Sequence, residues 1–242
     1  MTDHHTHIGQ FYDLYTSPSE LVRMMDVVGV EQFATSSTTI CEGNYRKVLA
    51  EMSELVGMAG NRVLPVLWIL PQMLSDGGLQ QFLDSGIQWK MLKIHPQLHP
   101  LSWHCGSRNL QKVIRLAKRL QLPLMIHTGE FAGCYPFLFE RSIRNNPSVT
   151  FILAHGRPLD ETVNMLQRYP NVLTDTAFMP IEHIAELCCL NLSHRILWGT
   201  DIPIPHYYNR KEDCVTYYKN RLHELQKAVS EKHYHLILNN HL

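Results

Sequence analysis

The sequence lacks the signatures of several common protein classes. Its six cysteines include no CxxC pair, so we expect neither a zinc ribbon nor a disulfide scaffold. No stretch approaches the roughly 18 apolar residues of a membrane span, and the start Met-Thr-Asp-His-His does not resemble a signal peptide. The 22 basic and 22 acidic residues balance, which gives no general attraction to nucleic acid or membranes. These absences predict a soluble protein of the reducing cytoplasm.

Two nucleotide-binding motifs are also missing. Neither GxGxxG nor GxxxxGK[ST] occurs anywhere in the 242 residues. An open, doubly wound sheet normally presents such a glycine-rich loop to the phosphates of its ligand. Their absence weakens the prediction of nucleotide binding and of that fold without excluding either.

Short apolar, β-branched runs alternate with longer amphipathic stretches along the whole chain. The predicted strands are 3–8, 30–36, 63–70, 89–94, 122–127, 149–154, 172–176 and 195–199. The predicted helices are 19–28, 44–59, 79–85, 109–120, 135–145, 159–169, 181–190 and 212–231. Eight strand–helix units favour parallel strands that close into a barrel, at about 30 residues per unit. The chain is therefore predicted to be one α/β domain, residues 1–242, folded as a (β/α)8 TIM barrel of minimal size.

Histidine is unusually frequent, with 15 residues against 13 glycines and 13 prolines. Several histidines stand where predicted strands end, and chemistry in a TIM barrel gathers at the carboxyl ends of its strands. Five predicted strand ends carry polar side chains able to bind metal or move protons: Asp3-His4-His5-Thr6-His7, Lys93-Ile94-His95-Pro96, His127-Thr128-Gly129, Ala154-His155-Gly156 and Gly199-Thr200-Asp201.

The first of these segments has the spacing of a metal-binding strand. Residues two apart on a strand share a face, so His5 and His7 project together into the barrel mouth, and His4 points away. Together with His127 and Asp201 they form a nitrogen-and-oxygen set that suits Zn²⁺, with Mn²⁺ and Fe²⁺ as alternatives. A lone histidine at a strand end is usually structural. It is the combination at equivalent strand ends that predicts a metal site.

In their order along the chain, these segments resemble the amidohydrolase superfamily of metal-dependent TIM-barrel enzymes. The resemblance is strongest to the branch that includes aminocarboxymuconate semialdehyde decarboxylase, and it covers essentially the whole chain. It implies that His5, His7, His127 and Asp201 bind one metal ion. It also implies that Asp201 accepts a proton from water and that His155 handles protons or, when protonated, stabilises an oxyanion.

Lys93 leaves the number of metal ions open. Some members of the superfamily hold two ions through a carboxylated lysine on the fourth strand, and the resemblance would then make Lys93 and His155 ligands of a second ion. In the alternative, Lys93 is an ordinary ammonium that binds a substrate carboxylate or pairs with an acidic neighbour. We favour this alternative, in which the site holds one metal ion. Arg157 is a further candidate for an acidic substrate group, and Trp103 is a candidate wall of the pocket.

The predicted activity is hydrolysis of an amide, ester or lactone bond in a small, carboxylate-bearing metabolite by metal-activated water. The alternative is non-oxidative decarboxylation at the same site, and a phosphodiesterase or nuclease ranks third because Lys93 stands where that barrel family has a carboxylate.

The basic segment 108–119 has helical apolar spacing, typical of a solvated outer helix rather than a nucleic-acid site. A small molecule is the expected partner, without nucleic acid or membrane, and a homo-oligomer is left open.

Overall fold

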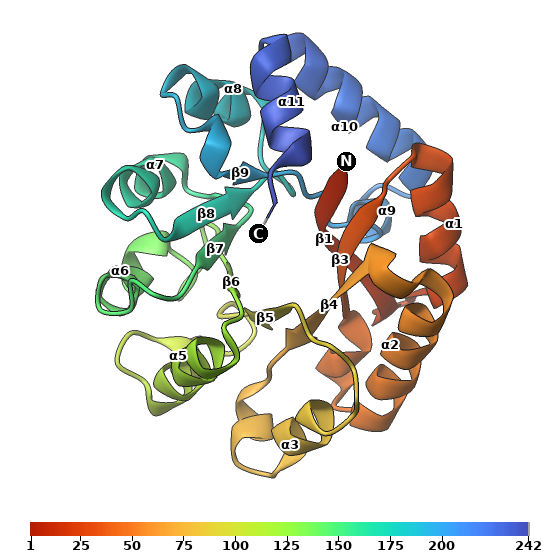
Figure 1. Cartoon of the computed structure of the whole chain (residues 1–242), viewed down its shortest axis with the longest axis vertical. Coiled ribbons are helices and arrows are strands. Elements are labelled where there is room, and N and C mark those ends of the chain that lie inside the picture. Colours follow the sequence, from red (N-terminus) through yellow and green to blue (C-terminus); the bar gives the residue numbers. More distant parts are fainter. Residues whose placement is uncertain (242) are drawn as a thin grey trace.

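The computed structural model describes residues 1–241, which form a ring of strands surrounded by helices (Figure 1). Eight strands run parallel in chain order, and they match the eight predicted ones. They are β1 (Thr2–Phe11), β3 (Gln32–Ser37), β4 (Val63–Trp68), β5 (Met91–Ile94), β6 (Leu124–His127), β7 (Phe151–Ala154), β8 (Val172–Asp175) and β9 (Ile196–Leu197). A ninth strand, β2 (Leu14–Thr16), was not predicted and pairs antiparallel with the end of β1.

The ring closes between β1 and the segment that follows β9. The amide of Asp201 donates to the carbonyl of His5, and the amide of His7 donates to the carbonyl of Ile202, both at 2.7 Å. Thr6 forms a parallel bridge to Ile202. These bonds place the residues after the last strand against the first strand, and they confirm the predicted α/β TIM-barrel fold.

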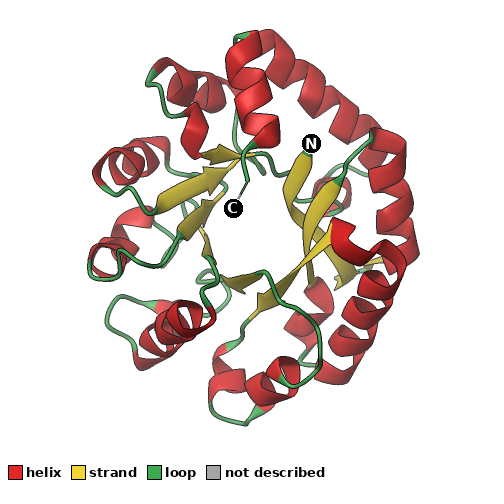
Figure 2. Cartoon of the chain, viewed as in Figure 1, coloured by secondary structure: helices red, strands yellow, loops and turns green. Residues whose placement is uncertain are grey.

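The helices lie outside the strands, in the alternation that the sequence predicts (Figure 2). Those that match predicted helices are α1 (Pro18–Val28), α2 (Tyr45–Ala59), α3 (Gly78–Leu83), α5 (Arg108–Leu120), α6 (Glu140–Arg144), α7 (Leu159–Arg168), α8 (Ile181–Cys189) and α10 (Cys214–Ala228). Three more were not predicted: α4 (Pro100–Trp103), α9 (Ile204–Tyr208) and α11 (Glu231–Asn239). The first two span only four and five residues, too few to show helical periodicity.

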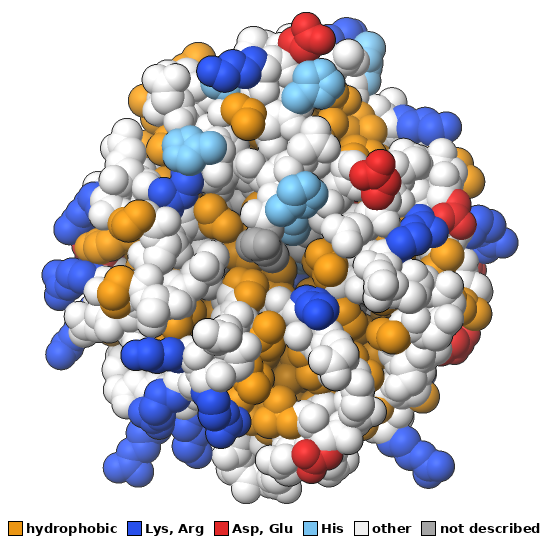
Figure 3. Space-filling model, viewed as in Figure 1, with side chains coloured by type: hydrophobic (Ala, Val, Ile, Leu, Met, Phe, Trp, Pro, Cys, Tyr) orange, Lys and Arg blue, Asp and Glu red, His pale blue; other side chains and the backbone are white. Residues whose placement is uncertain are grey.

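Helix α5 illustrates how the outer layer is built. Ser107 caps it by accepting a hydrogen bond from the amide of Leu110. Its apolar side chains, Leu110 and Val113 among them, are buried against the barrel, whereas its lysines and arginines are exposed. In Figure 3 basic side chains gather at the lower left, where Figure 1 shows this helix. The predicted amphipathic outer helix is therefore present.

The interior of the barrel is packed with side chains. Seven of them form an inner cluster distinct from the larger layer between strands and helices: Ala34, Val66, Met91, Met125, Ile152, Ala154 and Leu197. Such a filled interior leaves the carboxyl end of the barrel as the place for chemistry. No helix in the described part of the chain is long and apolar enough to cross a membrane.

The first and last parallel strands differ from their predicted lengths. β1 covers ten residues, longer than the predicted 3–8, because its end pairs with β2 to form a hairpin. β9 covers only two residues of the predicted 195–199. Beyond Leu197 the chain leaves the strand ladder, and the amide of Gly199 donates to Oγ1 of Thr176 instead. This departure brings Asp201 into the barrel mouth.

Candidate active site

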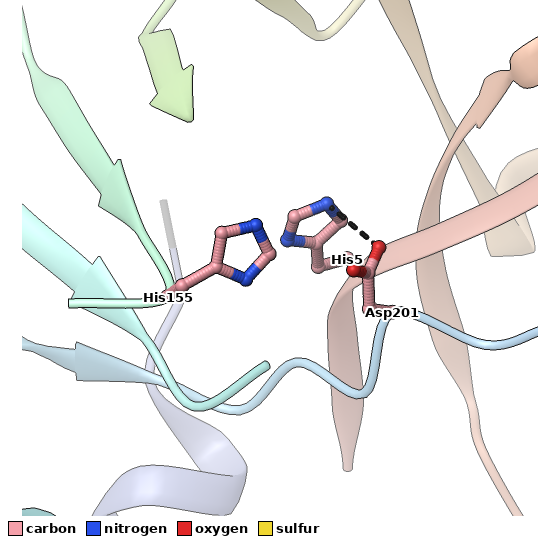
Figure 4. A group of neighbouring side chains, drawn as sticks. All are labelled: His5, His155 and Asp201. Carbon is pink, nitrogen blue, oxygen red and sulfur yellow. Dashed lines mark ion pairs between the residues drawn. The ribbon is translucent and has the colours of Figure 1, made fainter. Parts of the chain in front are cut away.

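Three segments far apart in the sequence bring polar side chains together at the barrel mouth (Figure 4). His5 and His7 come from β1, His155 follows β7, and Asp201 follows β9. Oδ1 of Asp201 lies 3.2 Å from Nε2 of His5 and 2.8 Å from Nε2 of His7. His5, His155 and Asp201 each offer a ligand atom within 4.8 Å of the others, and all three are buried.

Hydrogen bonds fix the tautomers of the two β1 histidines. Nδ1 of His5 lies 2.8 Å from a carboxylate oxygen of Asp175, and Nδ1 of His7 lies 3.2 Å from the carbonyl oxygen of Ser36. Because the Asp175 carboxylate and the Ser36 carbonyl only accept hydrogen bonds, each Nδ1 carries the proton and donates; the Ser36 hydroxyl, 3.0 Å from Nδ1 of His7, then acts as a second acceptor. Nε2 of each ring is then a lone pair that points toward Asp201, which is the orientation of a metal-ligating histidine.

The same reasoning applies to His155 and His127. Nδ1 of His155 donates to the carbonyl oxygen of Ala177 at 3.0 Å, which leaves Nε2 of His155 as an acceptor for Nδ1 of His127, also at 3.0 Å. Nε2 of His127 is in turn a lone pair, buried and without a hydrogen-bond partner among residues 1–241. The His127 ring is held by stacking on His95, with centroids 3.7 Å apart.

Burial keeps these imidazoles neutral. It lowers the pKa of His155 and of His7 to about 4, and that of His127 well below its usual value. As a neutral ring, His155 donates from Nδ1 to Ala177 and accepts from His127 at Nε2, so Nε2 can take a proton or ligate a cation only when the His127 hydrogen bond is released.

Asp201 is ionised. Burial by itself would raise the pKa of its carboxyl, but positive charge on His5 and a hydrogen bond from His7 would hold the pKa well below its usual range. When both rings are neutral, the ammonium of Lys93 supplies the attraction, since Asp201 in turn raises the pKa of Lys93. Oδ1 nevertheless has no hydrogen-bond partner in the described chain. A carboxylate oxygen and two imidazole lone pairs therefore face one another. Acceptors in this arrangement repel unless a cation lies between them, so the residues present fit a divalent metal ion of the zinc type.

Lys93 meets part of this need for positive charge. Its Nζ donates to Nε2 of His5 at 2.7 Å and lies 3.2 Å from Nε2 of His7. It also lies 4.8 Å from the ring centroid of Trp68. Burial lowers the pKa of Lys93, although Asp201 and Asp175 oppose that effect. The structure therefore brings Lys93 to the centre of the cluster.

Backbone strain is concentrated at this site. Six non-glycine residues of the described chain have a positive φ, a region that bulky L-residues seldom adopt. Four of them surround the cluster or its cavity: Tyr12, His155, Phe178 and Asp201. The other two, Gln121 and Asn191, follow the ends of α5 and α8, where the left-handed conformation is common. Strain of this kind persists where function requires a particular geometry.

The cluster forms the floor of a cavity of about 710 Å³. Arg157 lines the cavity, and its Nη1 is 3.8 Å from a carboxylate oxygen of Glu130, too long for a tight ion pair. Nε of Arg157 is buried without a hydrogen-bond partner in residues 1–241. Its guanidinium therefore has N–H groups free to bind an anionic group, which is what the predicted role in substrate binding requires.

A profile of the amidohydrolase family matches residues 3–236. The chain belongs to the amidohydrolase family. Comparison with curated protein sequences gives no match.

Among solved structures, this amidohydrolase chain is similar to an uncharacterised TIM-barrel protein from Bordetella bronchiseptica, with 17% identity, a TM-score of 0.70 and coverage of 99% of this chain and 96% of that chain. It is also similar to an amidohydrolase from Burkholderia multivorans with bound zinc, at 10% identity, TM-score 0.69 and coverage of 98% and 95%. A probable 2-pyrone-4,6-dicarboxylic acid hydrolase from Acinetobacter baumannii has 12% identity, TM-score 0.65 and coverage of 98% and 96%. At these identities the likeness shows the fold alone.

Trp103 does not lie where the sequence analysis expected it. Its side chain is fully buried in the apolar core and is not among the described residues that line the cavity. Helix α4 ends at Trp103, and Ser107 just beyond it donates to the carbonyl of Ser102, so the segment folds inward. The indole gains more by burial in the core than as a wall facing solvent.

Two residues that orient the histidines were missed. Asp175 accepts hydrogen bonds from Nδ1 of His5 and from the backbone amides of His155 and Ala177. Ser36 contributes its carbonyl to His7. Asp175 ends β8 and is the last residue but one of the predicted strand 172–176, so the strand-end pattern that pointed to the other site residues also marks it. Ser36, whose hydroxyl also lies 3.0 Å from Nδ1 of His7, ends the predicted strand 30–36 and is marked by the same pattern.

Proposed function

We propose that this chain is a metal-dependent hydrolase of an amide, ester or lactone bond in a small molecule that carries a carboxylate. The observation that supports this most is the set of lone pairs of His5, His7 and Asp201 that face one another in a buried site. Acceptor atoms that face one another in this way are stabilised when a cation binds between them. Family membership and the adjoining cavity agree with the proposal.

His5, His7, His127 and Asp201 are the proposed ligands of one Zn²⁺ ion, with Mn²⁺ and Fe²⁺ as alternatives. When bound, such an ion lowers the pKa of water toward about 7 and polarises a carbonyl group. Asp175 holds His5 in the tautomer that ligation requires. His155 has a ligand atom within 4.8 Å of ligand atoms of His5 and Asp201, and His127 is hydrogen-bonded to His155, so His155 is the candidate to extend the ligand set.

The chain's own residues then divide the remaining work. The ionised Asp201 accepts the proton of the attacking water and returns it to the leaving nitrogen or oxygen. Neutral His155 orients water or substrate through Nε2 once that atom releases the Nδ1 proton of His127. Arg157 binds the substrate carboxylate through its guanidinium, and the buried ammonium of Lys93 balances negative charge near the carbonyl.

Metal content tests the proposal directly. Protein purified without chelator should contain about one equivalent of a transition metal by elemental analysis, and His7→Ala should contain much less. A content well below one equivalent in the unsubstituted protein would refute the metal centre. A content near two, or a mass increase of one CO₂ on Lys93, would replace the one-metal assignment by a two-metal one with Lys93 and His155 as ligands.

Isotope labelling separates hydrolysis from decarboxylation. A panel of small lactones, esters and amides that carry a carboxylate is incubated with the enzyme in H₂¹⁸O. Hydrolysis transfers ¹⁸O into the acid product, because water attacks the carbonyl carbon. Release of CO₂ without that label would favour the decarboxylase.

A further inference from the structure

An aromatic wall lines one side of the cavity from its floor to its rim. It consists of Phe178, Tyr208, Phe11 and Tyr12, all of which line the cavity. The ring centroid of Phe178 is 5.9 Å from that of His155, and the centroid of Tyr208 is 6.2 Å from that of Phe178. Phe11 lies 6.5 Å from Tyr208 and 4.9 Å from Tyr12. The wall thus begins beside a candidate catalytic imidazole and reaches solvent.

Contacts between distant segments hold the wall in place. Tyr207, in α9, stacks on Tyr12 of the β1–β2 hairpin, with centroids 5.3 Å apart and ring planes 23° apart. Arg210 lies 5.1 Å from the ring centroid of Tyr207 and donates to a carboxylate oxygen of Asp13 at 2.6 Å. The hairpin tip and α9 are therefore joined by a stack, a cation–π contact and an ion pair, so the wall is preformed.

Core packing does not account for the outer part of the wall. Tyr12 is 73% exposed and Tyr208 is 69% exposed, an unusual position for two large rings. Tyr12 and Phe178 also adopt a positive φ, which disfavours bulky side chains. The hairpin turn between β1 and β2 accounts for the positive φ of Tyr12. The exposure of Tyr12 and Tyr208 and the strained backbone of Phe178 beside His155 are explained when these rings contact a ligand.

The same cavity contains a cationic group with unused hydrogen-bonding capacity. Arg157 is 27% exposed, and its Nη1 is 3.8 Å from Glu130, which is itself 48% exposed. Its buried Nε has no partner within the described chain. A carboxylate accepts two parallel hydrogen bonds from a guanidinium, so Arg157 is suited to bind one.

We propose that the substrate is an organic acid with a planar aromatic ring, that the ring packs on the aromatic wall, and that the carboxylate pairs with Arg157. This inference rests on the proposed function and specifies its substrate class. Aromatic rings favour edge-to-face or offset contacts with other rings, whereas a saturated ring of equal size lacks the quadrupole for these contacts. The wall therefore selects for planarity as well as for apolar area.

Binding of three small probes to the metal-loaded protein tests this selection by isothermal titration calorimetry. The probes are 3-phenylpropanoate, 3-cyclohexylpropanoate and 3-phenylpropanamide. The phenyl acid should bind about three- to tenfold more tightly than the cyclohexyl acid. It should bind about tenfold more tightly than the amide, which lacks the charge. Burial alone predicts the opposite order for the two acids, because the saturated ring is the more hydrophobic.

Matched variants assign each preference to its residues. Tyr208→Leu and Phe178→Leu should each reduce the preference for the phenyl acid, and Arg157→Gln should reduce the preference for acid over amide. Phe137→Leu is the control, since Phe137 is 48% exposed and is not among the described cavity residues. It should change neither preference.

Equal affinity for the two acids, or a ring preference that survives in both leucine variants, would overturn the aromatic-acid proposal. Elemental analysis of the same samples reports the metal independently. Absence of a ring preference in the unsubstituted, metal-loaded protein refutes this inference alone, whereas absence of metal from the unsubstituted protein refutes the proposed function.

Discussion

The two ends of the barrel both have a hollow, and the comparison shows that volume does not define a site. The carboxyl end has the cavity of about 710 Å³ described above, and the amino end has one of about 570 Å³. The second is lined by residues that precede β6, β7 and β8, including Pro123, Thr150 and Asn171. His241, the last residue that the structure describes, also lines this second hollow.

The two hollows differ in whether their polar atoms have partners. The side-chain amide of Asn171 donates to the carbonyl oxygens of Val149 and Asn146, at 2.9 and 3.2 Å. Within residues 1–241, no buried side-chain polar atom without a partner belongs to the lining of the amino-end hollow. At the carboxyl end, Asp201, His127 and Arg157 each have one. Unmet bonding capacity, rather than space, distinguishes the candidate site.

The largest expected effect is that of removing the ionised carboxylate. Asp201→Asn should lower turnover about 10³-fold, because an amide does not accept the proton of water. Asparagine tolerates the positive φ of this position, so the fold should persist. Turnover is measured on the first substrate found in the labelling panel. Lys118→Ala, in the amino-end hollow, is the control, and equal turnover of Asp201→Asn and wild type would disprove the proton role.

Acid should destabilise the metal-free protein through the carboxyl-end imidazoles. Neutral His7 and His155, with pKa values lowered to about 4, contribute stability that is complete above pH 6.5 and is lost toward pH 4, because the unfolded chain takes up protons first. Each loss is about 3 kcal/mol. Burial raises the pKa of Asp3 to about 7, so protonation of Asp3 stabilises the folded chain as the pH falls. This gain offsets the loss of stability from about one imidazole.

Thermal melting between pH 7.5 and 4.5 measures this loss. The melting temperature should fall with pH, and His7→Asn should fall less steeply than wild type. His241→Asn, at the amino end, should follow wild type. A melting temperature that rises as the pH falls would contradict the assignment of neutral buried imidazoles.

A smaller effect is expected from the residue that orients His5. Asp175→Asn should weaken metal binding about 10- to 100-fold, because the amide holds the ring of His5 and its tautomer less firmly than a carboxylate does. Competition with a chromogenic chelator measures the affinity, and a melting curve checks the fold. Unchanged affinity would mean that Asp175 supports only the backbone amides of His155 and Ala177.

Much of the fold could be predicted from local pattern. Alternating apolar runs and amphipathic stretches identified all eight parallel strands, and period-two spacing placed His5 and His7 on one face. Helices α4 and α9 escaped because a single turn has no measurable periodicity. Trp103 was misplaced for a related reason, since a loop aromatic has no pattern that distinguishes a pocket wall from the core.

The sequence by itself determined the kind of chemistry available, because imidazoles and a carboxylate at the ends of parallel strands must converge at one end of a barrel. Only the tertiary structure decided the state of those groups. Which nitrogen of His5 carries a proton depends on Asp175, 170 residues away. Whether His155 is charged depends on burial, and the aromatic wall joins residues 11–12 to residues 178 and 208. Protonation and shape depend on neighbours in space, and strand periodicity does not record which neighbours those are.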